Sequence, residues 1–143
     1  MTGIDTTWLV DLEVEESPRH EGALAIFEAW RMEKAAPLLA FTHVFLEFQH
    51  IVTDPRRFER PLPMALALER IWFWADLDRV RIVHSTDASF RRAQLWLSAY
   101  KLGRDRIIDT HMAAAYAEAG VDKILTANRE DFAVFNAFDL PNY

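Results

Sequence analysis

The chain has 143 residues, of which 51% are hydrophobic and 13% aromatic, and this length and composition predict one folded globular domain over residues 1–143. It contains no cysteine, which excludes disulfides, thiolate zinc sites and a cysteine nucleophile. The formal net charge is −6, from 22 acidic and 16 basic residues, and this balance argues at first sight against a nucleic-acid partner.

The first half of the chain alternates short apolar segments with amphipathic ones, which indicates strands separated by helices. A serine followed by proline is a common helix start, and a later proline stops a helical pattern. In chain order we predict a strand at Met1–Asp5, a helix at Thr6–Leu12, a helix from Ser17–Pro18 to Pro37, a strand at Leu38–Phe41, and a helix capped by Thr42 that ends at Asp54–Pro55.

The second half continues the same alternation. We predict a helix at Pro63–Leu77, a strand at Val80–His84, a helix at Asp87–Leu102 closed by Gly103, a helix at Asp109–Ala119 closed by Gly120, a strand at Val121–Ala127, and a tail, Asp131–Tyr143, that is a short turn or helix and then extended. Short strands separated by helices are typical of a parallel sheet covered on both faces. The fold class is therefore α/β, with a central, mainly parallel sheet of four or five short strands.

Four acidic residues follow predicted strands or open helices, where ligands of parallel sheets gather. They are Asp5, Glu47, Asp109 and Asp131. Carboxylates that share a site repel one another and lose hydration, so protons or a cation must compensate them. Mg²⁺ or Mn²⁺ is the natural partner of such oxygen ligands.

The charges are unevenly distributed along the chain. Residues 1–50 and 107–143 are acidic, whereas residues 51–106 carry eleven basic and seven acidic residues. A locally basic segment can face a phosphate backbone even in an acidic protein. We therefore keep a nucleic acid as an expected partner, with Arg91, Arg92, Arg104 and Arg106 as candidate contacts. The alternative is that these arginines form ordinary solvated helix faces.

Four motifs in order resemble the PIN domain family and, within it, the VapC-like toxins of bacterial toxin–antitoxin pairs. They are IDTTWLVDL at Ile4–Leu12, THVFLEF at Thr42–Phe48, IIDTHMAAAYAEAG at Ile107–Gly120 and ILTANREDF at Ile124–Phe132. Each motif alone is a weak signal, but their order, spacing and the overall length fit together. The resemblance covers essentially the whole chain, and it is weakest between Glu47 and Asp109.

The resemblance implies a metal-dependent ribonuclease, inhibited by a cognate antitoxin and forming a homodimer. Asp5 and Asp109 would bind the ion directly or through water, and Glu47 and Asp131 would orient the attacking water and any second ion. Thr6 and Thr126 would support the site by hydrogen bonding. Asn128 lies near the fourth acid, so whether Asn128 or Asp131 completes the site stays open, as does the choice between one ion and two.

Each candidate also has a plain structural interpretation. Asp109 and Asp131 are plausible helix caps, Glu47 a solvated helix carboxylate, and Asp5 the residue that closes a turn. His43, Glu47 and His50 share a helix face that suits a transition metal, but the second copy of such a motif is missing, so packing and surface roles are expected. The aromatic run Trp72–Trp74 suits core and subunit contacts better than base stacking, because three consecutive helical residues cannot share a face.

Other functional classes are less consistent with the sequence. Haloacid dehalogenases need a second acid two residues after the first, where Thr7 stands here, and a receiver domain needs an acid pair after its first strand. A housekeeping PIN-type nuclease without an antitoxin and a non-catalytic α/β interaction domain remain as alternatives. No basic region precedes an apolar stretch at the N-terminus, and the longest apolar runs are too short for a membrane, so we expect a cytoplasmic protein without a membrane partner.

Overall fold

The computed structural model describes residues 1–33 and 36–143. Within these residues four strands form one sheet in the order β3-β2-β1-β4, and every pairing is parallel. The strands are β1 (Thr2–Ile4), β2 (Leu38–Phe41), β3 (Val80–Val83) and β4 (Lys123–Leu125). The predicted α/β class with a short parallel sheet is thus confirmed, at the lower of the two expected strand numbers.

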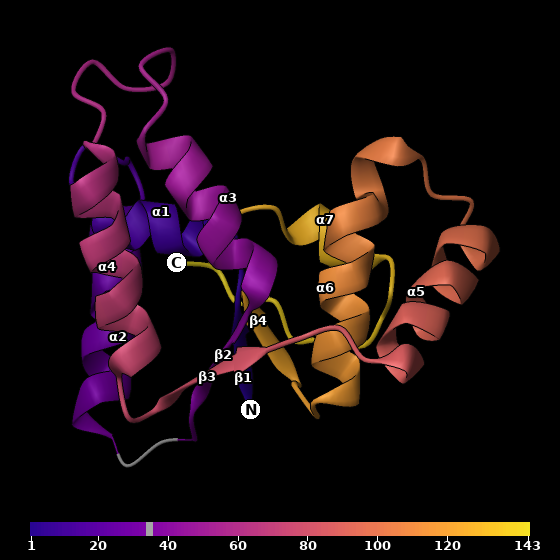
Figure 1. The fold of residues 1–143 in the computed structure, drawn as a ribbon. Helices are drawn as coiled ribbons and strands as arrows, with labels where there is room; N and C mark the ends of the chain where they lie inside the picture. Colours follow the sequence, from indigo (N-terminus) through magenta and orange to yellow (C-terminus); the bar gives the residue numbers. More distant parts are fainter. Residues whose placement is uncertain (34–35) are drawn as a thin grey trace.

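Helices cover both sides of this sheet. They are α1 (Thr6–Glu13), α2 (His20–Met32), α3 (Thr42–Val52), α4 (Met64–Asp76), α5 (Asp87–Ala99), α6 (Ile107–Glu118) and α7 (Arg129–Ala133), with a 3₁₀ turn η1 (Arg104–Arg106) before α6. In Figure 1, α5 and α6 pack together on one side, and α1, α2 and α4 lie on the other. Among the described residues, no helix has the length and apolar character needed to cross a membrane.

The alanine-rich helix α6 packs against the centre of the sheet through Tyr116, which is fully buried. The tyrosine hydroxyl lies 2.6 Å from the carbonyl oxygen of Ile4 and 3.0 Å from that of Leu39, and it accepts the amide of Phe41 at 2.9 Å. A Cβ on Gly3 would come within 2.8 Å of the tyrosine ring, so this position requires glycine. Tyr116 therefore connects β1 and β2, the strands that lead into α1 and α3.

Two predicted helix starts were wrong, each because the hydroxyl of the expected cap residue has another partner. Ser17 does not cap α2, because its hydroxyl donates to the carboxylate of Asp11, and the helix begins at His20. Thr42 is the first residue of α3 and not its cap, and its hydroxyl donates to the carbonyl of Val83. The end of the α2 prediction, near Pro37, falls partly on residues outside the described range.

The end of α5 differs from the prediction as well. The helix ends at Ala99, and Lys101 takes the left-handed conformation with φ of 52°, whereas Gly103 is extended. Gly120 does have a positive φ of 76° after α6, as predicted. The tail forms α7 and then an extended segment that bridges to Lys123 through Asp139.

The aromatic run in α4 divides between core and surface. Trp74 is buried, contacts the ring of Trp8 edge-on at 6.1 Å, and donates its indole N–H to Glu13 at 2.7 Å. Trp72 and Phe73 remain 64% and 49% exposed. The core role is confirmed for one of the three, and the other two are free to contact a second molecule.

Candidate functional site

Asp5 stands at the junction of β1 and α1, where it is the N-cap of the helix and only 4% exposed. One carboxylate oxygen accepts the amide of Thr6 at 2.7 Å, and the other accepts the hydroxyls of Thr7 at 2.6 Å and Thr126 at 2.7 Å. Burial raises the pKa of Asp5, these hydrogen bonds lower it, and the charge of Glu47 raises it further. With three donors bound, a carboxylate retains about one of its roughly four acceptor positions for another ligand.

Glu47 lies on α3, next to the buried residue Phe48, and its own side chain is exposed. The hydroxyl of Thr6 donates to its carboxylate at 2.7 Å. Thr6 follows Asp5 in the chain, so one short segment contacts both acids. The threonines thus bond as the resemblance implied, Thr6 to Glu47 and Thr126 to Asp5.

Asp109 lies in the first turn of α6, where the helix dipole favours an ionised carboxylate. Its pKa is nevertheless raised to about 7, first by burial and then by the negative charges of Asp5 and Asp131. Glu47 adds to the increase, and only Arg106 opposes it. Asp109 is therefore close enough to the other three acids to be repelled by each of them.

Asp131 lies in the first turn of α7 and is held by Arg106, the residue before α6. The Nε of Arg106 is 3.3 Å from the Asp131 carboxylate, and its guanidinium also donates to the Asp131 carbonyl. Asn128 is the N-cap of α7, but its side chain forms no cap bond there. Its backbone N–H donates to the hydroxyl of Thr126. Two interpretations are wrong: Asp109 and Asp131 are not helix caps, since Arg106 and Asn128 hold those positions.

The four acids fit a divalent cation by their chemistry and charge. All their ligand atoms are oxygens, which suits Mg²⁺ or Mn²⁺ better than a soft metal. Burial first, and then the charges of neighbouring acids, raise the pKa values of Asp5 and Asp109, and Arg106 only partly offsets the increase at Asp109. Over residues 1–33 and 36–143, however, no three acidic or histidine side chains already converge on one ion position.

The histidines near Glu47 have other roles. His43 stacks on the ring of Phe41 with centroids 5.3 Å apart, and His50 is at the surface. His111, on α6, contacts the ring of Phe90 and lies 3.1 Å from the side-chain nitrogen of Gln94. These contacts agree with the packing and surface roles expected from the sequence.

The four arginines expected to contact RNA all have an acidic partner. Arg91 pairs with Asp87 at 2.8 Å and Arg104 with Asp105 at 3.8 Å, both on the surface. Arg92 binds Glu118 at 2.7 Å, which connects α5 to α6. Exposed ion pairs of this kind are weak, so a phosphate can compete for them. Arg106 differs, because it is partly buried against Asp131.

Thr7 is the site residue that sequence reasoning missed. Its hydroxyl donates to Asp5 and accepts the amide of Ala127 at 2.9 Å, so it connects the ends of β1 and β4. The available signal was the threonine pair that directly follows Asp5 in a helix start, where hydroxyls commonly bond to nearby groups.

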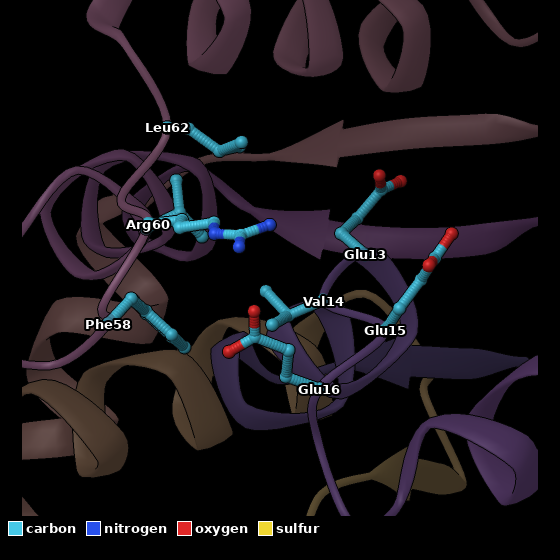
Figure 2. A pocket seen from close by; sticks show the side chains of 8 residues that line it. Glu13, Val14, Glu15, Glu16, Phe58, Arg60 and Leu62 are labelled. Carbon is cyan, nitrogen blue, oxygen red and sulfur yellow. The ribbon is translucent and has the colours of Figure 1, made fainter.

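A hollow lies at the C-terminal end of α1, the end opposite to Asp5. It measures about 190 Å³ and is lined by Glu13, Glu15, Glu16 and Arg60, among others. Figure 2 shows Arg60 extending into the space between these glutamates. None of the four candidate acids lines it, so this acidic hollow is separate from the candidate site.

Comparison with solved structures identifies proteins that have a similar fold. Neither a protein-family model nor a curated protein sequence matches the chain. Among solved structures, the sarcin-ricin loop cleaving toxin VapC20 of Mycobacterium tuberculosis is similar, with a TM-score of 0.71 and 20% identity over 93% of this chain and 94% of that chain. A toxin–antitoxin complex from Klebsiella pneumoniae gives a TM-score of 0.66 and 17% identity over 99% of this chain and 97% of that chain.

VapBC-1 from nontypeable Haemophilus influenzae gives a TM-score of 0.69 and 12% identity over 99% of this chain and 96% of that chain. These likenesses extend over nearly the whole chain, although identity is low throughout. The chain has the PIN-like fold of the VapC toxins.

Proposed function

We propose that this chain is a metal-dependent endoribonuclease, the toxin of a toxin–antitoxin pair, formed by one PIN domain over residues 1–143 and acting in the cytoplasm. The observation that carries the proposal is the clustering of four acids: Thr6 bonds to Glu47, Thr7 and Thr126 bond to Asp5, and the pKa of Asp109 is raised by burial and by the charges of the other three. Within the fold of the VapC toxins, those acids are the ones that the motif resemblance selects. A relative described as cleaving the sarcin-ricin loop, and others described as toxin–antitoxin complexes, support RNA and an antitoxin as partners.

Each acid would have a distinct role. Asp5 and Asp109 would hold Mg²⁺ or Mn²⁺, and Glu47 and Asp131, or Asn128 in its place, would hold the attacking water and any second ion. A bound ion lowers the pKa of water and offsets charge that builds on the phosphoryl oxygens. Glu47, oriented by the hydroxyl of Thr6, is placed to accept a proton from the attacking water. Arg91, Arg92, Arg104 and Arg106 stay candidates for contacts with the RNA backbone.

Metal removal tests the activity. We expect the purified protein to cleave at least one labelled RNA from a panel of ribosomal, transfer and messenger RNA fragments when Mg²⁺ or Mn²⁺ is present. A chelator should stop cleavage, and excess metal should restore it, because the carboxylates alone cannot offset the charge of the reacting phosphate. Gel analysis of the products checks this. Cleavage that continues in chelator would show that the proposed mechanism is wrong.

A second expectation concerns the homodimer. Leu68 and Trp72 lie one turn apart on α4 and are 42% and 64% exposed, so they form an apolar face that we propose as the subunit contact. Replacing Trp72 by Gln should raise the dimer dissociation constant about tenfold or more, since buried tryptophans dominate such interfaces. Analytical ultracentrifugation measures this. Met32→Gln, at an equally apolar and 87% exposed position on α2, is the control and should leave the dissociation constant unchanged.

A further inference from the structure

A groove of about 370 Å³ lies beside Asp5, between α1, the end of α3 and the connection from β4 to α7. None of the arginines expected from the sequence to contact RNA lines it. Thr7, Asp11, Arg19, Ile51, Arg57 and Phe58 are among the residues that line it.

The groove is continuous with the candidate site. Thr7 lines it, and the same hydroxyl donates to Asp5 at 2.6 Å. Ile51 lies four residues after Glu47 on α3, so the two share a helix face. A smaller hollow of about 140 Å³ next to the groove shares Arg19 with it and is lined by Thr126, which also donates to Asp5. Two hydrogen bonds to Asp5 thus come from residues that line these hollows.

The arginines at the groove face solvent, whereas the neighbouring acids already bind other side chains. Among the described residues, no acid forms an ion pair with Arg19, which is exposed. The side chain of Arg57 is 57% exposed, while that of its partner Asp54, 3.9 Å away, is only 9% exposed and also binds Arg56. Asp11, the acid in the groove, accepts hydrogen bonds from Ser17 and Tyr143. An anion in the groove would therefore meet guanidinium groups first.

The groove also offers apolar surface. Ile51 and Phe58 line it and are half-buried. Aliphatic and aromatic side chains next to cations are the combination that binds single-stranded nucleic acid, because bases contact the apolar faces while phosphates contact the cations. An acidic peptide would use the arginines but could pack on Phe58 only where it has an aromatic residue, whereas every nucleotide carries a planar base.

We propose that this groove binds the single-stranded stretch of the RNA substrate next to the bond that is cut, with Arg19 and Arg57 on phosphates and Phe58 and Ile51 against a base. This inference rests on the proposed function, since it names where that substrate lies. It adds a binding surface formed by α1, the segment before α2, the end of α3 and the loop after α3, and none of the α5 arginines lines that surface.

RNA binding in chelator tests the inference, because binding is then measured without cleavage. The probe is a fluorescein-labelled single-stranded RNA, followed by anisotropy over a range of salt concentrations. For the double variant Arg19→Ala/Arg57→Ala we expect affinity about tenfold lower or more, and a salt dependence reduced by about 0.7 for each lost phosphate contact. Arg81→Ala, at an exposed position on β3, is the matched control and should stay within about twofold of the wild type.

The outcomes separate this inference from the proposed activity. If the wild type cleaves RNA with Mg²⁺ and the double variant binds RNA as Arg81→Ala does, the inference is overturned and the activity stands. If the double variant loses binding but the wild type cleaves no RNA with metal, the groove is supported and the activity is wrong. If polyglutamate displaces RNA from the wild type at equal concentration, the groove belongs to an acidic protein segment and the inference is overturned. Arg19→Lys/Arg57→Lys should retain most of the binding, and thermal melting checks that each variant is folded.

Discussion

Replacing Asp109 by Asn is expected to lower metal-dependent RNA cleavage by about a hundredfold or more, and at the same time to stabilise the metal-free protein above neutral pH. Cleavage falls because a proposed ligand loses its charge. Stability rises because burial disfavours the charged carboxylate and because Asp5, Asp131 and Glu47 repel it, whereas the amide carries no charge. The two effects have opposite directions, so loss of activity cannot be attributed to unfolding.

The pH dependence follows from the sign of the shift. The pKa of Asp109 is about 7 in the folded protein against an ordinary value of 3.8, so between these values the folded state binds more protons than the unfolded state. The free energy of unfolding of the wild type should therefore fall as pH rises from about 4 to about 7, and should change little above that through this group. After allowance for the part of the carboxylate that water reaches, Asp109→Asn should be more stable at pH 8 by about 1–2 kcal/mol.

Urea unfolding in chelator at several pH values measures this difference. Asp76→Asn, at the exposed end of α4, is the control and should change neither cleavage nor the pH dependence. If Asp109→Asn cleaved RNA at the wild-type rate, Asp109 would not be a metal ligand or catalytic residue. Loss of cleavage without stabilisation at pH 8 would show that the four acids do not repel one another as proposed.

Asp5→Asn should lose cleavage in the same way but differ in stability. Asp5 accepts three hydrogen bonds, from the Thr6 amide and the hydroxyls of Thr7 and Thr126. An asparagine has one oxygen and an amino group, so at least one donor would lose its acceptor, at a cost of about 1–3 kcal/mol. The free energy lost with this hydrogen bond offsets the free energy gained by removing a buried carboxylate whose pKa is raised. Asp5→Asn is thus expected to be no more stable than the wild type at pH 8, unlike Asp109→Asn.

Replacing Tyr116 by Phe is expected to lower the free energy of unfolding by about 1–3 kcal/mol, which is large for the loss of a single oxygen atom. The hydroxyl is fully buried between β1 and β2, and its removal takes the acceptor from the Phe41 amide and the donor from the Ile4 carbonyl. Water cannot replace these bonds at a position where even a Cβ on Gly3 would collide with the ring. Chemical denaturation measures the change.

Tyr100→Phe is the matched control for that experiment. Tyr100 is 41% exposed and contacts the ring of Phe135 edge-on at 5.9 Å, a contact that phenylalanine preserves. Its substitution should change stability by less than about 0.5 kcal/mol. Equal stability of the two variants would mean that the Tyr116 hydroxyl does not connect the strands that lead to Asp5 and Glu47.

Two of the candidate acids could be selected from the sequence because they follow strands, whereas Glu47 and Asp109 were selected through the motif resemblance. Once the chain is recognised as a parallel sheet, the carboxyl ends of its strands meet at one edge, and Asp5 and Asp131 must come near it. The threonines next to β1 and β4 follow for the same reason. Their individual hydrogen bonds could not be predicted, because a hydroxyl can donate to any of several acceptors within reach. The hydroxyl of Thr6, for example, donates to Glu47 and not to Asp5.

Helix ends and charged surfaces were harder to predict. Ser17 has the residue type of a helix cap, yet its hydroxyl donates to Asp11, six residues earlier on α1. Arg106 belongs to the basic segment of the chain, yet its partner is Asp131, 25 residues away in sequence. Arg19 lies in the acidic first third of the chain and was not considered for RNA.

The sequence by itself determined the α/β alternation and the parallel sheet, because period, turn residues and strand ends are local properties of the chain. It selected the four acids as candidates through the motif resemblance. The tertiary structure decided how strongly those acids interact and where cations face them. Electrostatic energies depend on distance and burial, which no local pattern contains. The raised pKa of Asp109 and the exposure of Arg19 beside Asp5 therefore appear only after the strands, α3 and α6 have packed together.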